Sequence, residues 1–163
     1  MIRPFIPWPD KRLRTAAEPI GKLTDEHRTI WDDMVETMEA MPGYGLAAPQ
    51  IGVMLRLAVV DCSTERGKVV RMADPEIIAT SSEAFEWDEA SPNLPGISTT
   101  IKRPKHVTVS FIDHEGERVR QDFEDLWATS VQHQIDHLNG RMFFDNLSRM
   151  KRAMLLKKAG KHR

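Results

Sequence analysis

The sequence predicts an α+β domain, and three features of its apolar pattern carry that prediction. A helix is expected near residues 25–41, short strand-like runs fill residues 55–123, and two further helices close the chain. Helices that stand apart from the strands along a chain are typical of an α+β domain and not of a parallel βαβ sheet. Because 163 residues can bury roughly two-thirds of the surface of the unfolded chain, one domain over residues 1–163 is expected.

The first helix is predicted from its start signal and from the spacing of its apolar residues. Thr24 is a suitable N-cap, and the two acidic residues after it favour the helix dipole. Apolar side chains then recur at helical spacing as far as Met38, and Pro42 should end the helix. Residues 1–20 are rich in proline and should be extended, with a short helical turn near residues 12–17.

The middle of the chain predicts strands, because its runs are rich in β-branched residues or alternate in polarity. Six strands are expected, at residues 55–61, 68–72, 75–80, 83–87, 106–112 and 118–123. Glu115-Gly116 is a hairpin-type turn signal between the last two. A helix at about 124–139 should end before Gly140, and a final helix should cover about 148–160.

Composition excludes several classes of partner. A net charge of −1 argues against binding to free nucleic acid through bulk electrostatics. No apolar run approaches the ~20 residues of a membrane span, and the N-terminus lacks the apolar stretch of a signal peptide, so a cytoplasmic protein without a membrane partner is expected. Cys62 is the only cysteine, which rules out an internal disulfide, and it should pack as a small apolar residue at a strand end.

Two histidines mark the candidate site. His133 and His137 are four residues apart, which places them on one helix face with about 5–6 Å between Cβ atoms, a spacing that suits a shared metal ion. Taken alone, the pair fits ordinary core or surface histidines better than a metal site. In the zinc-hydrolase pattern HExxH, a glutamate general base follows the first histidine. Here Gln134 follows it, and a neutral amide cannot take that proton.

Three motifs occur in order along the chain. They are GYGLAAPQIG at 43–52, EASPNLPG at 89–96 and QHQIDHLNG at 132–140, and WPDKRLR precedes them at 8–14. Together they resemble the peptide deformylases, whose motifs are GxGLAAxQ, EGCLS and QHExDH. The resemblance covers nearly the whole chain and implies the deformylase fold, in which bent antiparallel or mixed sheets surround a central helix that carries the histidine pair.

The resemblance also implies an activity and a set of roles. Members of the family remove the formyl group from the N-terminal methionine of nascent proteins, using iron(II) or a substitute such as nickel or zinc. By position, the metal ligands are His133, His137 and Ser91, the last at the place of a cysteine. Gln50 and Gln134 hold the catalytic positions, Gln134 at the place of the general-base glutamate. Gly43, Gly45 and Leu46 are the expected substrate-binding residues.

Three departures from the family pattern weaken this chemistry. The Ser91 hydroxyl is a poor metal ligand, and losing the base at Gln134 typically costs about 10²–10⁴ in rate. Pro92 has no N–H, and one missing oxyanion donor costs on the order of 10²–10³. The leading expectation is therefore a deformylase-like protein without ordinary catalysis. It would hold no metal or a weakly bound divalent ion, and would keep a cleft for formyl-Met-like peptides as a binding or regulatory module.

Other interpretations remain open. The main alternative is an active metallohydrolase that deformylates nascent chains weakly or by altered chemistry. Ser91 could act as a nucleophile with Gln50 as its oxyanion donor, or Asp88 or Glu89 could replace the missing ligand. A third interpretation is that Ser91 and Gln134 were introduced to silence an active enzyme, because Cys-to-Ser and Glu-to-Gln changes are commonly made for that purpose. Pro92 would not be introduced for that purpose, so natural divergence is favoured.

Two supporting contacts are expected. By resemblance, Glu89 and Arg103 should form a structural ion pair. Gln134 should keep a hydrogen bond across the site.

The tail after Asp145 has seven basic residues and no acidic one: Arg149, Lys151, Arg152, Lys157, Lys158, Lys161 and Arg163. The resemblance implies docking on the ribosome near the nascent-chain exit. The alternative is a solvated helix whose Met150, Met154 and Leu155 pack inward.

Overall fold

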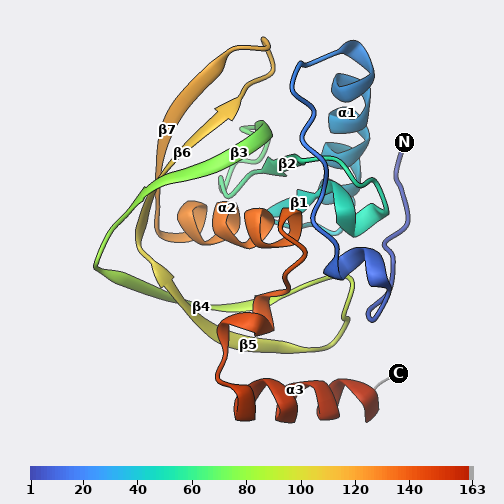
Figure 1. The fold of residues 1–163 in the computed structure, drawn as a ribbon, viewed down its shortest axis with the longest axis vertical. Coiled ribbons are helices and arrows are strands. Elements are labelled where there is room, and N and C mark those ends of the chain that lie inside the picture. Colours follow the sequence, from blue (N-terminus) through green and yellow to red (C-terminus); the bar gives the residue numbers. More distant parts are fainter. Residues whose placement is uncertain (162–163) are drawn as a thin grey trace.

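Helix α2 (Asp125–Leu138) lies at the centre of the molecule in the computed structural model, which describes residues 1–161. A five-stranded sheet covers one side of this helix, and the long two-stranded ribbon β4–β5 covers another (Figure 1). The expected α+β architecture is therefore confirmed, as is the central helix that carries the histidine pair. Every named strand pairs antiparallel with its neighbours.

The five-stranded sheet has the order β1-β2-β3-β6-β7. Its strands are β1 (Gly45–Ala47), β2 (Leu57–Val60), β3 (Val70–Thr80), β6 (His106–Ile112) and β7 (Arg118–Glu124). The predicted turn between β6 and β7 is present, and Gly116 adopts a φ of 85°, a left-handed conformation that glycine allows at little cost.

The β3 segment differs from its prediction, because the two short strands expected at 68–72 and 75–80 form one strand. The register against β6 shifts between Ala73 and Glu76, where Asp74 has a φ of 45°. The Asp74 carboxylate accepts hydrogen bonds from the backbone N–H groups of Ile20 and Gly21, which hold this bend in place. A local bulge therefore bends the strand without ending it.

Only one of the two strands of the second sheet was predicted. Strand β4 (Ala84–Ala90) was predicted in part, whereas its partner β5 (Ser98–Pro104) was missed. Of the seven residues of β5 only Ile101 and Arg103 are buried, so the segment lacks the apolar alternation that marks a strand. Strand β1 was also missed, since three residues are too few to show a period.

The helices begin and end close to their predicted limits. Helix α1 (Asp25–Ala40) starts at Thr24, whose hydroxyl accepts a hydrogen bond from the His27 N–H. Helix α3 (Arg149–Lys161) follows a 3-10 turn, η3 (Phe143–Asn146), and two further 3-10 turns are η1 (Lys11–Arg14) and η2 (Ala48–Ile51). No helix within residues 1–161 has the length and apolar character needed to cross a bilayer.

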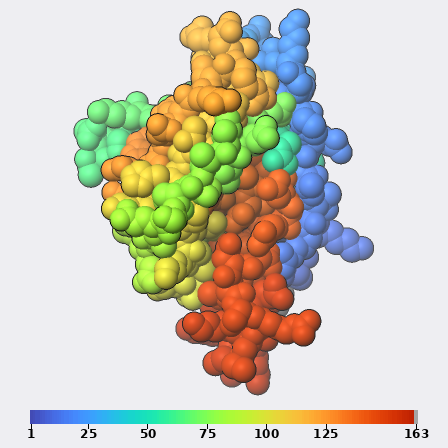
Figure 2. Space-filling view, turned by 60° about the vertical axis from the view of Figure 1, so that its left-hand side comes forward, coloured from blue at the N-terminus to red at the C-terminus, as the bar shows by residue number. Residues whose placement is uncertain are grey.

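The core consists of layers on both sides of β2 and β3. Trp31 and Met34 of α1 are fully buried against one face of the five-stranded sheet, and Val131 of α2 packs against the other. A separate cluster around Phe143 and Phe144 joins η3 to β5 and to the N-terminal segment. Helix α3 lies at one end of the molecule and projects from it (Figure 2).

Candidate active site

A cleft of about 630 Å³ opens between α2, the edge strand β4 and the β1–η2 segment. Six of the eight predicted site residues line it: Gly43, Gly45, Gln50, Ser91, His133 and Gln134. The other two, His137 and Leu46, are buried, and Leu46 belongs to the α1 core cluster. Any contact of Leu46 with a ligand would therefore come from its backbone.

His133 is held by a carboxylate that lies behind it. Its Nδ1–H donates to Glu89 Oε1 at 2.8 Å, and its ring stacks on Phe143 with 6.1 Å between centroids. Because a carboxylate only accepts, this contact fixes the proton on Nδ1 and leaves the Nε2 lone pair free. A carboxylate that orients a histidine in this way is the usual second partner of a metal-binding imidazole.

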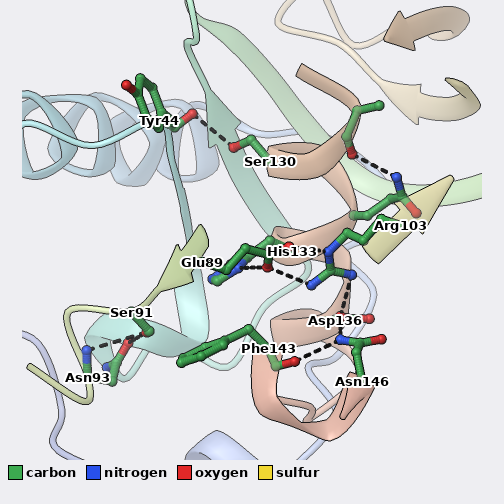
Figure 3. A network of polar contacts seen from close by, with 12 residues as sticks. Tyr44, Glu89, Ser91, Asn93, Arg103, Ser130, His133, Asp136, Phe143 and Asn146 are labelled. Carbon is green, nitrogen blue, oxygen red and sulfur yellow. Dashed lines mark hydrogen bonds and ion pairs between the residues drawn. The ribbon is translucent and has the colours of Figure 1, made fainter. Parts of the chain in front are cut away.

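Glu89 is in turn held by Arg103, which confirms the expected ion pair (Figure 3). Arg103 Nε and Nη2 donate to the two oxygens of Glu89 at 2.7 and 2.8 Å, and Nη1 donates to Asp136 Oδ2 at 2.9 Å. Burial raises the pKa of Glu89, but the hydrogen bonds from Arg103 and His133 outweigh it and lower the pKa below its ordinary value. Both oxygens of Glu89 are thus occupied, and the structure gives no support for Glu89 as a replacement metal ligand.

His137 lies beneath His133, with 5.0 Å between ring centroids. It is 1% exposed, and neither ring nitrogen has a hydrogen-bond partner among the described residues. Burial, followed by the charges of His133 and Arg103, holds the pKa of His137 well below its usual range, so the ring is neutral. Leaving a buried polar atom unpaired costs about 1–3 kcal/mol, which a metal ion bound to a ring nitrogen would offset.

The donor set therefore fits a divalent ion through its two imidazoles. No group of three or more His, Cys, Asp or Glu side chains suited to a metal occurs within residues 1–161, so the third protein ligand would have to be a weaker donor. Ser91 is the candidate by position.

Ser91 is committed to a network of amides. Its Oγ donates to Asn93 Oδ1 at 3.0 Å and accepts from Gln50 Nε2 at 3.3 Å. No hydrogen bond joins it to His133 or His137 in the described part of the chain, which leaves the serine-nucleophile interpretation without a base. Asn93 was missed as a site residue, although its place two residues after Ser91 in the second motif was a usable signal.

The Gln50 side chain is fixed at both ends. Its Oε1 accepts from the Ala47 N–H at 2.9 Å, and its Nε2 also donates to Asn93 Oδ1 at 2.9 Å. Its amide is thus aimed at the part of the cleft beside Ser91. Because Pro92 has no N–H, Gln50 is the candidate donor for negative charge that develops there, although it must first give up its longer hydrogen bond to Ser91.

The first motif needs a glycine at position 45 for lack of space, and not because the backbone has a positive φ there. A Cβ at this position would lie 2.5 Å from both Gln134 Nε2 and Ser130 Oγ of α2. Only glycine lets β1 approach the helix so closely. The hydrogen bond expected across the site from Gln134 is not seen for its buried Oε1, which has no partner within residues 1–161.

Two antiparallel sheets surround a helix that carries a pair of histidines beside a cleft, and this arrangement is typical of a metallohydrolase. Comparison with known proteins identifies the family. A family model described as polypeptide deformylase matches residues 2–153. A protein of Afipia carboxidovorans named Peptide deformylase is 43% identical over 96% of this chain and 93% of its own length, and one of Cellvibrio japonicus is 38% identical over 98% and 95%. The chain belongs to the peptide deformylase family.

Solved structures agree with this assignment. A peptide deformylase from Legionella pneumophila superposes with a TM-score of 0.91 at 38% identity, covering 99% of this chain and 95% of that one. The peptide deformylase from Ehrlichia chaffeensis in complex with actinonin gives 0.90 at 33% identity, covering 99% and 97%. The expected deformylase fold is thereby confirmed.

The expectation that the chain has lost deformylase catalysis and serves as a binding module is wrong. Relatives named Peptide deformylase match it along nearly its whole length at 38–43% identity, which favours the alternative, an active hydrolase. The expectation took the changes at Ser91, Pro92 and Gln134 to be enough to abolish the reaction. Losing single catalytic groups lowers a rate by finite, non-additive factors, and the cleft, the oriented His133 and the placed Gln50 are all still present.

Proposed function

We propose that the protein is a metal-dependent amide hydrolase that removes the formyl group from the N-terminal methionine of newly made chains, by a proton transfer that Gln134 does not perform. The observation that carries the proposal is the pair of imidazoles under one cleft, with His137 buried and without a hydrogen-bond partner within residues 1–161. The chain also matches peptide deformylases over almost its full length. Because the substrate is a nascent chain, a cytoplasmic location is part of the proposal.

The metal would be iron(II), nickel or zinc, as in the family. His133 through Nε2 and His137 through a ring nitrogen would hold it, with Ser91 as a weaker third ligand. When bound, such an ion supplies a Lewis acid for the formyl carbonyl and lowers the pKa of a water molecule.

The remaining work falls to the side chains of this chain. Glu89 and Arg103 keep the His133 ring in one orientation, and Gln50 presents its amide where the formyl oxygen gains charge. Gln134 lines the cleft, but its amide cannot accept a proton. The proton must leave to solvent, so the rate should rise with pH.

The shape of the cleft suits a short peptide. Phe5, Met41 and Leu126 supply apolar lining, and Trp87 and Tyr44 contact edge to face with 6.5 Å between ring centroids. Both aromatic residues line the cleft and are 38% and 47% exposed, which leaves their rings available to a bound chain.

The test is hydrolysis of formyl-Met-Ala-Ser by protein that has been stripped with a chelator and reloaded with nickel(II). We expect formate and free amine in equal amounts, and at least a tenfold loss in His137→Ala. His106→Ala is the matched control, since His106 is half-exposed on β6 and binds Glu124 away from the cleft. Turnover no faster than that of His137→Ala would overturn the proposal.

We also propose the ribosome as a partner of α3. The helix carries six of the seven basic tail residues, with Arg163 outside the described residues, and Met150 and Met154 are 74% and 67% exposed instead of packed inward. A truncation after residue 147 should lose co-sedimentation with ribosomes that weakens as salt is raised. Unchanged binding, or none in the full chain, would remove this partner.

A further inference from the structure

Arg66 lies outside the cleft and reaches back to its rim, the segment of residues 43–45 that lines one side. Arg66 belongs to the loop between β2 and β3. Its Nη2 donates to the Gly43 carbonyl at 2.7 Å, and its Nη1 donates to the Asp61 carbonyl at 2.8 Å. Nη2 and Nε also donate to the two carboxylate oxygens of Glu39, at 2.9 and 3.2 Å. One side chain therefore ties together the end of α1, the start of the first motif and the residue after β2.

The backbone of this loop has an unusual conformation at the same place. Arg66 has a φ of 64° and Gly67 a φ of 79°, so two successive residues are left-handed. Glycine adopts this conformation at little cost, but a residue with a side chain keeps it only where the surrounding contacts hold it. The carboxylate of Asp61 closes the loop by accepting from the N–H groups of Ser63 and Lys68 at 2.9 and 3.1 Å. The hydrogen bonds of the Arg66 guanidinium then hold the strained residue against the rim.

The rim itself is rich in glycine. Gly43 and Gly45 both line the cleft, and a glycine backbone loses more freedom on being fixed than that of any other residue. The carbonyl of Tyr44, between them, accepts from Ser130 Oγ of α2 at 3.0 Å (Figure 3). The carbonyl of Gly43 accepts from Arg66. Removing the guanidinium would therefore free the Gly43 carbonyl while that of Tyr44 stays fixed.

We propose that Arg66 is a positioning residue of the cleft, which acts through the Gly43 carbonyl to keep the rim in the shape that receives an N-formyl peptide. The inference rests on the proposed function, from which it takes this substrate. Within residues 1–161 the hydrogen bonds of Arg66 go to Glu39, Gly43 and Asp61 and to no group beside the two imidazoles, so peptide binding should depend on Arg66 and the chemical step should not.

The expected size of the effect follows from preorganisation. A segment that is already held in its binding conformation binds more tightly, because less freedom is lost when the ligand arrives. Freeing the backbone of about one residue corresponds to roughly five- to tenfold weaker binding. The ion pair with Glu39 is partly exposed and should add little of its own.

The experiment compares Arg66→Met, which removes the donors and keeps an apolar stem, with the matched control Arg71→Met. Arg71 of β3 also binds a carboxylate of α1, that of Asp32, but lies away from the cleft. A general loosening of α1 would therefore appear in both variants. kcat and KM for formyl-Met-Ala-Ser are measured on the nickel-loaded protein. The dissociation constant of the same peptide is measured by calorimetry on the full chain with chelator.

In Arg66→Met, KM and the dissociation constant should rise together by about five- to tenfold, with kcat within about twofold of the wild-type value. Arg71→Met should leave all three unchanged. If Arg66→Met does not fold, Arg66→Lys takes its place, and both constants should rise at least about threefold, because an ammonium lacks the forked donors of a guanidinium.

Unchanged KM and dissociation constant in the folded Arg66 variant would overturn the inference, and so would an equal rise in Arg71→Met or a fall in kcat alone. Failure of the wild type to bind the peptide by either measure would also overturn it. A dissociation constant that depends on Arg66 in a protein without turnover would sink the hydrolase and leave the role of Arg66 standing. Turnover with no dependence of KM on Arg66 would do the reverse.

Discussion

Replacing Arg103 with methionine should strongly destabilise the protein. The side chains of Arg103 and Glu89 are only 5% and 3% exposed, so this ion pair is buried, unlike the surface pairs of the molecule. The substitution removes three charge-assisted hydrogen bonds of 2.7–2.9 Å and leaves the Glu89 carboxylate with His133 alone. Breaking a buried pair by removing one partner typically costs about 3–5 kcal/mol.

The pH dependence gives the prediction a second test. In the wild type the pKa of Glu89 is lowered, so its contribution to stability is present above the unfolded value near 4.3 and is lost as the pH falls through the folded one. Without the guanidinium, burial raises the pKa of Glu89 with little opposition. The variant should then gain, relative to wild type, as the carboxylate protonates, so the difference between the two should shrink below about pH 5.

Urea unfolding at pH 7.5 in chelator measures the effect, with Glu89→Gln/Arg103→Met as the decisive double variant. It removes the uncompensated charge and should recover at least half of the loss. Glu65→Gln, which breaks the exposed Lys68–Glu65 pair, should cost no more than about 1 kcal/mol. A loss below about 1 kcal/mol in Arg103→Met, or a double variant as unstable as the two single losses added, would refute the reasoning.

Four further outcomes are expected. Ser91→Cys should raise the affinity for zinc or cobalt at least about tenfold in chelator competition and add a thiolate–cobalt absorption band, because a thiolate is the better ligand. Gln134→Glu should raise kcat at pH 7 by about 10² or more and flatten the pH–rate profile, since a base is restored. In metal-free protein, lowering the pH from 7.5 to 5.5 should cost about 1.4 kcal/mol in urea titrations, because the pKa of His137 is lowered and the unfolded state binds a proton near pH 6.5; His137→Gln should lack this loss. Burial raises the pKa of the Cys62 thiol to about 12, so a thiol reagent at pH 8 should react with it only after unfolding.

Local signals were sufficient for most of the fold. The cap at Thr24 and the turn at Gly116 gave helix and hairpin positions, because each depends on residues adjacent in the chain. Strand β5 escaped prediction because its inward-facing side chains include the charged Arg103, whose burial makes sense only beside Glu89 of β4. This segment is a strand because it pairs with β4, and the local spacing of apolar residues does not reveal that pairing.

The residues of the candidate site were likewise predicted only in part. Motif spacing brought Gln50, Ser91 and His133 together, and the structure places all three on one cleft. Asn93 was missed, because its hydrogen bonds to Gln50 and to the Ile6 carbonyl join segments that only the fold brings together.

The frame of the site is held by residues other than Ser91 and Gln134. His133 is oriented by Glu89, which is fixed by Arg103, and none of these depends on the side chains at 91 or 134. The orientation of His133 is therefore independent of which side chains stand at positions 91 and 134. Metal affinity and proton transfer should then respond to different single substitutions, Ser91→Cys for the first and Gln134→Glu for the second. If either one alone changed both properties, metal affinity and proton transfer would share a cause that this geometry does not contain.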